Sequence, residues 1–412
     1  MTRSWVPGAD GSGFGADHLP YGVFSVGGGA PRAGVRIGAY VLDLAAALGD
    51  DVFAAPALNP FLARGRPAWA AARSRVIGLL TDDARRAEAE PHLVPLDRVR
   101  TRLPVEVADY ADFYCSLEHA TNLGRILRPA EEPLKPNWRH LPVGYHGRAG
   151  TVVVSGTPVA RPSGQRLPPT PPSGASSVGP TFAKRIPPGA PATAPVFGPS
   201  VRLDIEAELG FVVGAASRLG EPVATGAFPD HVFGVALVND WSARDIQAWE
   251  YVPLGPFGGK SFATSMAAWI TPLEALEPAR VAGPAQEPPP LPYLARTGDW
   301  GLDLTLEVRL NGEVIARPPY DRMYWTPDQM LAQLTVTGAS LRPGDLYASG
   351  TVSGPGPAEC GSLIELTRNG ADPLKLRDGT TRAFLEDGDE ITITAAAPGG
   401  LTLAEVRGMI TP

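Results

Sequence analysis

Glycine and proline punctuate this chain densely enough to favour short regular elements. The sequence contains 47 glycines and 45 prolines, and both residue types weaken or end helices and central strands. Several stretches between them are short and alternate apolar with polar residues, as residues 302–310 illustrate. This combination favours β structure with many turns over a helical protein. The sequence therefore predicts a mainly β (α+β) fold.

The remaining composition argues against several classes of function. With 412 residues and 44% hydrophobic content, the chain can build one large or two medium domains. Its net charge of −7 argues against a nucleic-acid-binding surface. No apolar stretch approaches the roughly 18 residues that span a bilayer, and the N-terminus lacks the apolar core of a signal peptide. Two cysteines cannot form a disulfide framework, so we expect a cytoplasmic protein without membrane or nucleic-acid partners.

A boundary is expected near residues 90–104, which proline and arginine interrupt repeatedly. We therefore predict an N-terminal domain at residues 1–103 and a second domain at residues 104–412. The first contains strand-like runs between residues 14 and 45 and a helical pattern over residues 59–80. Because its chemically reactive side chains are scattered, we expect it to be structural or to support assembly.

The segment from Asp112 to Arg148 concentrates reactive side chains, including three of the six histidines. Good helix formers run from Ser116 to Leu127, and a helix that starts near Asp112 would place Asp112 and His119 on one face. That pair could be a metal ligand beside a base, or an acid that orients an imidazole. Alternatively, Asp112 is a helix N-cap and His119 a surface histidine.

A strand is predicted over residues 201–213, and it carries two acids on one face. Glu206 and Glu208 are two residues apart, so both side chains leave the strand on the same side. Their mutual repulsion and apolar flanks require a compensating positive charge, most economically a divalent cation. The alternative is a solvated strand edge.

A second polar cluster follows the apolar run at residues 231–238. A short helix over residues 242–250, capped by Ser242, would place two polar side chains on one face. A glycine- and proline-rich loop then returns toward the same place. Packing alone does not explain this set, so we expect a functional site. Its members are Asp240, Arg244, Gln247 and Lys260.

The rest of the chain adds turn signals and one unexplained acid. Asn311-Gly312 predicts a type I′ hairpin, and Thr326 is expected to cap a helix. Residues 162–200 are rich in proline, serine and glycine and predict a long surface loop. Glu365 stands alone in an apolar run interpreted as a strand, so a polar partner is implied.

Long blocks of this sequence resemble the fumarylacetoacetase family. The blocks cover residues 109–124, 134–159, 239–262 and 341–355, and shorter N-terminal blocks such as LPYGVF match as well. The resemblance extends in order over nearly the whole chain. It implies a small SH3-like N-terminal barrel, a mixed β-roll catalytic domain and a homodimer. The implied activity is hydrolysis of the carbon–carbon bond of 4-fumarylacetoacetate, which ends tyrosine and phenylalanine degradation.

The resemblance also implies a role for each residue of the site. It places a cofactor, Ca²⁺ and/or Mg²⁺, on Asp112, Glu206, Glu208 and Asp240, with further contacts at Lys260 and Thr264. An ammonium cannot ligate a cation, so the Lys260 contact would run through water or backbone. The implied general base is His119, oriented by Glu365, and Arg244, Gln247 and Lys260 would stabilise negative charge. The implied substrate contacts are Tyr114, Arg128, Tyr145, Gln247, Tyr251 and Thr351.

Three alternatives stay open at this point. A related acylpyruvate hydrolase or 2-oxo-acid decarboxylase could share the fold. A metal-stabilised binding module would need no catalytic base. Cys115 and His119, four residues apart, could form a nucleophilic pair, although that pair would leave the four acids unexplained.

Overall fold

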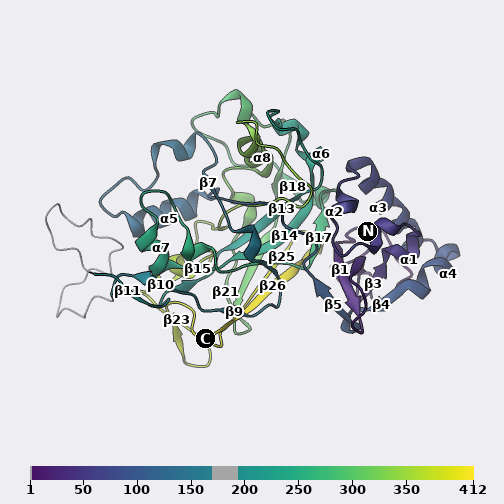
Figure 1. Cartoon of the computed structure of the whole chain (residues 1–412), viewed down its shortest axis with the longest axis horizontal. Coiled ribbons are helices and arrows are strands. Elements are labelled where there is room, and N and C mark those ends of the chain that lie inside the picture. The colour runs from purple at the N-terminus through teal and green to yellow at the C-terminus, as the bar shows by residue number, and fades with distance from the viewer. Residues whose placement is uncertain (1, 169–193) are drawn as a thin grey trace.

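The computed structural model describes residues 2–168 and 194–412 as a mixed α/β protein with large sheets and few helices (Figure 1). Two sheets dominate the described residues, one 13-stranded and one 5-stranded. Buried aliphatic and aromatic side chains form one large core that both sheets share. The prediction of β structure with few helices is therefore confirmed at this coarse level.

The larger sheet combines strands from the N-terminal part of the chain with strands between residues 110 and 348. Its main path runs through β4 (Leu93–Pro95), β3 (Tyr40–Asp43), β2 (Arg32–Ile37), β1 (Tyr21–Val26), β17 (Trp269–Pro272), β14 (Val232–Asp240), β13 (Ala207–Val213), β22 (Leu346–Ala348), β6 (Tyr110–Phe113) and β7 (Gly144–His146). Three strands branch from this path: β5 (Val99–Arg102), β8 (Val152–Val154) and β16 (Thr264–Met266).

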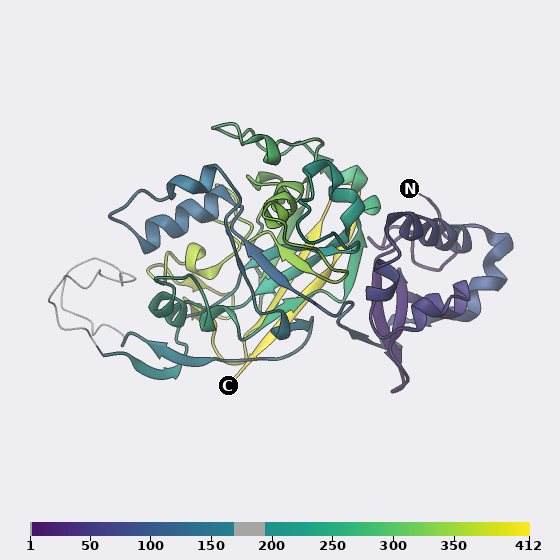
Figure 2. The same cartoon turned by 45° about the horizontal axis from the view of Figure 1, so that its top comes forward.

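The pairing of β1 with β17 joins the two predicted domains edge to edge. Tyr21 lies opposite Ile270, and Gly22 lies opposite Trp269. A Cβ atom on Gly22 would approach Trp269 Cε3 to 2.5 Å, so this close contact requires glycine. Figures 1 and 2 both show the N-terminal segment at one end of the molecule, and Figure 1 shows β17 on the side of the larger part that faces it. Among the described residues the sheet does not close into a barrel, so the SH3-like barrel is not shown.

The smaller sheet confirms the predicted hairpin. Its strands are β21 (Glu313–Ala316), β20 (Thr305–Leu310), β25 (Glu390–Ala396), β26 (Thr402–Thr411) and β9 (Val159–Ala160). Asn311 and Gly312 connect β20 to β21 with φ values of 50° and 80°, as a type I′ turn requires. Apolar residues of β20 alternate inward, and β25 and β26 lie along β14 in Figure 1.

The N-terminal helical pattern is two helices instead of one. These helices are α2 (Asn59–Leu62) and α3 (Arg66–Thr81). Gly65 separates them with φ of 78°, a conformation that no right-handed helix contains, and Pro67 then fits the first turn of α3. The other N-terminal helices are α1 (Leu44–Leu48) and α4 (Arg86–Ala89).

Three helices correct predictions made from the sequence. Asp112 lies on β6, and helix α5 (Leu117–Leu127) begins only after its N-cap Ser116. Glu365 lies on the short helix α9 (Leu363–Leu366) and not on a strand, because the Leu363 and Ile364 amides donate to the Asp204 carboxylate, which satisfies a helix start. Helix α7 (Arg244–Glu250) has Ala243 at its N-cap, while Ser242 belongs to a strand.

The remaining described elements are short. Helix α8 (Pro327–Thr335) begins after Thr326, as predicted, and α6 (Phe228–His231) is a single turn. The paired strands are β10 (Ser163–Arg166) with β11 (Val196–Pro199), β12 (Leu203–Asp204) with β15 (Ser242–Ala243), β18 (Arg280–Val281) with β19 (Gly301–Leu302), and β23 (Leu374–Lys375) with β24 (Thr381–Arg382). The ends of the predicted 162–200 loop thus form a hairpin, and its residues 169–193 lie outside the described residues.

In the part of the chain that the structure describes, we find no helix with the length and apolar character needed to cross a bilayer.

Candidate active site

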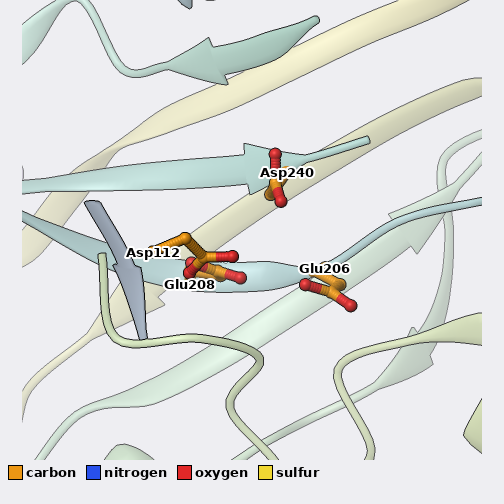
Figure 3. Close-up of side chains that lie close together, drawn as sticks. All are labelled: Asp112, Glu206, Glu208 and Asp240. Carbon is orange, nitrogen blue, oxygen red and sulfur yellow. The ribbon is translucent and has the colours of Figure 1, made fainter. Parts of the chain in front are cut away.

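Four carboxyl groups meet in the buried middle of the larger sheet (Figure 3). Asp112 projects from β6, Glu206 directly precedes β13, Glu208 is the second residue of that strand, and Asp240 ends β14. One oxygen from each residue lies within 4.8 Å of the others, and all four residues are buried. The alternative of a solvated strand edge for the two glutamates is therefore wrong.

Strand register brings these acids together. Strand β13 runs antiparallel to β14, with Ala207 opposite Asn239, so the start of one strand meets the end of the other. The amide of Asp240 donates to the carbonyl oxygen of Glu206 at 3.1 Å. Strand β6 reaches the same place through β22, which pairs with β6 in parallel and with β13 antiparallel.

Two of the four carboxylates have oxygens that no described residue satisfies. Neither Oε1 nor Oε2 of Glu208 accepts a hydrogen bond within the described parts of the chain, and neither does Oδ1 of Asp112. Burial and the neighbouring acids raise the pKa of Asp112 and Glu208 well above their ordinary values. Buried unsatisfied carboxylates are costly, and an all-oxygen donor set suits a hard divalent cation. The residues therefore fit the expected metal.

Lys260 compensates the other two carboxylates. Its Nζ atom donates to Glu206 Oε2 at 2.7 Å, to Asp240 Oδ2 and to Ser242 Oγ at 2.9 Å. Burial alone would raise the pKa of Glu206, but Lys260 and Arg244 outweigh it and hold that pKa below its ordinary value. Burial would lower the pKa of Lys260, and Asp240 and Glu206 raise it instead.

Two hydroxyl groups complete the surroundings of Asp240. Thr264 lies opposite Asp240 in the β14–β16 pair and donates from Oγ1 to Asp240 Oδ1 at 2.8 Å. The Tyr145 hydroxyl donates to Asp240 Oδ2 at 3.2 Å. Both residues were expected at the site from the resemblance, Thr264 near the cation and Tyr145 near the substrate, and both touch the carboxylate cluster.

Arg244 is the second buried cation of the site. Its Nη1 atom lies 2.7 Å from Glu206 Oε1 and also donates to Gln247 Oε1 at 3.2 Å. Its Nε atom donates to Asp204 Oδ2 at 2.8 Å. Its Nη2 atom is buried and has no hydrogen-bond partner among the described residues. One donor of this guanidinium is therefore available to a bound molecule.

Sequence reasoning missed Asp204. Its spacing of two residues from Glu206 was a visible signal, because residues 204, 206 and 208 would all share one face of a continuous strand. The strand is instead interrupted: Asp204 belongs to β12, which pairs with β15, and Glu208 belongs to β13. Asp204 therefore contacts Arg244 rather than the unpaired acids.

His119 and Glu365 form a buried pair beside the carboxylates. The Nδ1 atom of His119 lies 2.6 Å from Glu365 Oε2. Its Nε2 atom lies 4.0 Å from Glu206 Oε1. Asp112 therefore does not orient His119, and the partner that Glu365 required is found.

Glu365 is held as a carboxylate by several donors. Asn122 donates to Oε1 at 3.0 Å, and Ser353 and Ser362 donate to Oε2 at 3.0 and 2.7 Å. Burial would raise the pKa of Glu365, but His119 and these hydrogen bonds lower it below its ordinary value. An ionised Glu365 accepts a hydrogen bond from the Nδ1–H group of His119, so the proton stays on Nδ1 and the lone pair is on Nε2.

The other residues expected to contact substrate have different surroundings, and only some of them touch the His119–Glu365 pair or the carboxylates. The Tyr114 ring packs edge-on against His119, with centroids 5.3 Å apart. Thr351 is buried, and its hydroxyl has no hydrogen-bond partner among the described residues. Arg128 caps the end of α5 and donates to the Pro133 carbonyl at 3.1 Å. Tyr251 follows α7, and within the described residues its hydroxyl makes no hydrogen bond to the cluster.

Cys115 does not have the surroundings of a nucleophile. It precedes helix α5 and is fully buried. Burial, followed by the charge of Asp112, raises the pKa of its thiol well above the ordinary value. Reactive cysteines need a lowered pKa, so the Cys115–His119 pair has no support.

Comparisons with known proteins agree over nearly the whole length. The families described as "Fumarylacetoacetase N-terminal" and "Fumarylacetoacetate (FAA) hydrolase C-terminal" match residues 17–104 and 109–407. The chain is 44% identical to the fumarylacetoacetase of Homo sapiens over 418 residues, which cover 96% of this chain and 95% of that protein. It is also 44% identical to the fumarylacetoacetase of Arabidopsis thaliana over 428 residues, covering 97% and 95% of the two chains.

A solved structure supports the same fold. A fumarylacetoacetate hydrolase from psychrophilic Exiguobacterium antarcticum aligns with a TM-score of 0.55, covering 95% of this chain and 99% of the other. The two sequences are 18% identical, so this likeness concerns the fold. Because two family descriptions together match most of the chain, and full-length relatives share more than two fifths of its residues, the chain belongs to the fumarylacetoacetate hydrolase family.

Proposed function

We propose that this protein hydrolyses the carbon–carbon bond of 4-fumarylacetoacetate to give fumarate and acetoacetate, the last step of tyrosine and phenylalanine degradation. The observation that carries this proposal is the buried His119–Glu365 pair directly beside four clustered carboxylates. Full-length similarity to named fumarylacetoacetases supports the choice of substrate. A binding module would have no use for an oriented imidazole with a free Nε2.

The carboxylate cluster would hold the cofactor, which we propose to be Ca²⁺ and/or Mg²⁺. Asp112, Glu206, Glu208 and Asp240 would supply its oxygen ligands, and Lys260 and Thr264 would fix Asp240 from outside. When bound, the cation supplies positive charge that stabilises negative charge on substrate oxygens.

His119 would act as the general base. Its Nδ1 proton stays in the hydrogen bond to Glu365, and Nε2 takes a proton from water. The resulting hydroxide adds to the carbonyl carbon of the fumaryl group. The bond from this carbon to the acetoacetate portion then breaks, and its electron pair leaves with acetoacetate. Return of the Nε2 proton to the acetoacetate carbon that received this electron pair completes acetoacetate, and the fumaryl portion departs as fumarate.

Developing negative charge would be stabilised by the cationic side chains. Arg244 has one donor, Nη2, without a partner in the described part of the chain, and Gln247 accepts from Nη1 of the same guanidinium. Lys260 already donates to Glu206, Asp240 and Ser242, so we propose that its main role is to stabilise the carboxylate cluster. These fixed charges lie in a buried region, where they act more strongly than in water.

The substrate contacts would surround the base. Tyr114 contacts His119, Tyr145 contacts Asp240, and the hydroxyl of Thr351, which has no partner within residues 2–168 and 194–412, offers a donor. Arg128 would bind a carboxylate end of the substrate. We assign Gln247 and Tyr251 to the same pocket because both lie on or next to helix α7.

We also propose the larger organisation that the family resemblance implies. Residues 1–103 would form the SH3-like domain and residues 104–412 the mixed β-roll catalytic domain, within a cytoplasmic homodimer. Sedimentation analysis and fractionation of the source cells test the assembly and the location.

A spectrophotometric assay tests the proposed activity. Loss of fumarylacetoacetate absorbance is followed with purified protein, after chelation and after addition of Ca²⁺ or Mg²⁺. We expect turnover that chelation abolishes and either cation restores. Turnover of acylpyruvates alone would instead support an acylpyruvate hydrolase, and no turnover with either cation would refute the proposed function.

A further inference from the structure

Asp204 is fully buried and accepts four hydrogen bonds. Its Oδ1 atom accepts from the amides of Ile205 at 2.8 Å and Leu363 at 2.7 Å. Its Oδ2 atom accepts from Arg244 Nε at 2.8 Å and from the Ile364 amide at 3.1 Å. A single carboxylate thus joins strand β12, helix α7 and helix α9.

Both helices that Asp204 contacts carry residues of the proposed reaction. Leu363 and Ile364 are the first two residues of α9, and the next residue is Glu365, which orients His119. Arg244 is the first residue of α7 and lies against Glu206. Asp204 therefore contacts both the helix start that carries Glu365, the partner of His119, and the guanidinium of Arg244.

The geometry of Arg244 shows why this anchor matters for chemistry. A guanidinium is planar, so fixing two of its nitrogens fixes the direction of the third. Asp204 holds Nε and Glu206 holds Nη1, and Nη2 is left without a partner among the described residues. Without Asp204, the Arg244 guanidinium could rotate about its ion pair with Glu206, and Nη2 would no longer point in a fixed direction.

We propose that Asp204 is a positioning residue. It fixes the positions of Glu365 and Arg244 relative to each other, so that the His119 base and the Arg244 Nη2 donor can both contact one bound substrate. This inference rests on the proposed function for its kinetic consequence. Its structural consequence, a fixed His119–Glu365 hydrogen bond, does not depend on the identity of the substrate.

The variant Asp204→Asn tests the inference with little change in volume. The amide oxygen can still accept from Ile205 and Leu363, but the NH₂ group faces two donors, Arg244 Nε and the Ile364 amide. We expect kcat to fall about 10²-fold, the scale of an ångström-sized misplacement, while KM changes less than threefold. Asp204→Ser serves as the second variant if the asparagine protein fails to fold.

Asp389 provides a matched control. It is also a buried aspartate, and it accepts from Arg382, Asn311 and the Glu386 amide, away from the carboxylate cluster. Asp389→Asn should lower stability to a similar degree as Asp204→Asn and leave kcat unchanged. Equal loss of kcat in both variants would assign Asp204 a merely structural role.

Two further readouts separate this inference from the proposed function. In the Arg244→Gln background, Asp204→Asn should lower kcat by a smaller factor than it does alone, because the part of its effect that acts through Arg244 is already lost; fully additive losses would overturn the inference. In proton NMR, the downfield signal of the His119 Nδ1 proton, assigned by its loss in His119→Asn, should shift in Asp204→Asn and not in Asp389→Asn. An unchanged signal would overturn the inference even if the unmodified protein hydrolyses another substrate.

Discussion

The four clustered carboxylates have different neighbours, and this difference decides what each substitution does. Glu206 and Asp240 are paired with Lys260, whereas Glu208 has two oxygens without donors in the described structure. Removing a paired charge leaves its partner buried and uncompensated. Removing an unpaired charge relieves repulsion in the metal-free protein.

Glu208→Gln and Glu206→Gln should therefore behave oppositely without metal. We expect chelated Glu208→Gln to be at least as stable as the chelated unmodified protein, and chelated Glu206→Gln to lose roughly 3–5 kcal/mol. Added Ca²⁺ or Mg²⁺ should raise the Tm of the unmodified protein, and this rise should shrink in both variants because each lacks a ligand. Calorimetry with chelator and with excess metal measures these effects. A full metal-induced rise in Glu208→Gln would contradict the ligand assignment.

His119→Ala should leave folding and metal binding intact and lower kcat about 10²–10⁴-fold, the usual contribution of a general base. Steady-state kinetics with metal-saturated protein checks this result. His140→Ala is the control, because His140 is exposed and lies in the same sequence window. Near-normal kcat in His119→Ala would remove His119 from the role of base.

At this scale, the acids and the histidine that the sequence singled out lie together in the structure, and the residues that support them were missed. Acids in apolar runs, such as Glu206 and Glu365, are conspicuous because burial demands a partner. The donors to Glu365 are Asn122, Ser353 and Ser362, which are ordinary polar residues on separate segments. Nothing local distinguishes such residues, because their role follows from distant contacts.

Helix α5 positions His119, the proposed base, in the site. Its N-cap Ser116 accepts from the His119 amide at 3.1 Å and donates to the Ser353 carbonyl at 3.1 Å. The sequence predicted this helix but began it too early, at Asp112. Residues Tyr110–Phe113 instead pair in parallel with β22, whose strand lies more than 200 residues later in the chain. A long-range pairing of this kind overrides local helical spacing, and periodicity alone cannot reveal it.

Ser116→Ala should cost about 1 kcal/mol of stability, as loss of an N-cap usually does. It should also lower kcat several-fold, because the capped turn carries His119 and contacts the Ser353 segment that supports Glu365. Urea unfolding and kinetics on the same preparation measure both effects. Thr326→Ala, which removes the N-cap of α8, is the control and should lower stability without changing kcat. If both variants lose kcat equally, the N-cap of α5 has no specific effect on the position of His119.

Across the whole molecule, one sheet unites the residues before and after position 103. Strand β1 pairs with β17, and the rings of Tyr21 and Trp69 pack edge-on against Phe233 at 5.3 and 5.4 Å. The sequence predicted the strands of the first part and not this junction. Pairing partners about 250 residues apart leave no periodic signal, so the shared sheet could not be predicted from local patterns.

His18 makes this junction sensitive to acid. Its Nδ1 donates to the Gly13 carbonyl at 2.9 Å, and its Nε2 lies 2.8 Å from Thr271 Oγ1. Burial lowers its pKa from 6.5 to about 4. The unfolded chain therefore binds this proton first, and stability contributed by neutral His18 is complete above pH 6.5 and is lost as the pH falls toward 4.

By pH 4.5 this loss should reach about 2–3 kcal/mol, at about 1.4 kcal/mol per pH unit. Other groups titrate in the same range, so the measurement is the difference between the unmodified protein and His18→Gln in urea unfolding at pH 7.5 and 4.5. The variant should show the weaker acid dependence. Identical pH dependence of the two proteins would mean that His18 protonates freely in the folded state.

The central claim is that water, activated by His119, cleaves a carbon–carbon bond at the fumaryl carbonyl. Short turnover of fumarylacetoacetate in H₂¹⁸O, followed by mass spectrometry of both products, tests it most directly. Substrate kept in the same water without protein corrects for spontaneous exchange of ketone oxygens. We predict one labelled oxygen in the fumarate carboxylate formed and none above that control in acetoacetate. Label in acetoacetate instead, or release of carbon dioxide without fumarate, would contradict the proposed reaction.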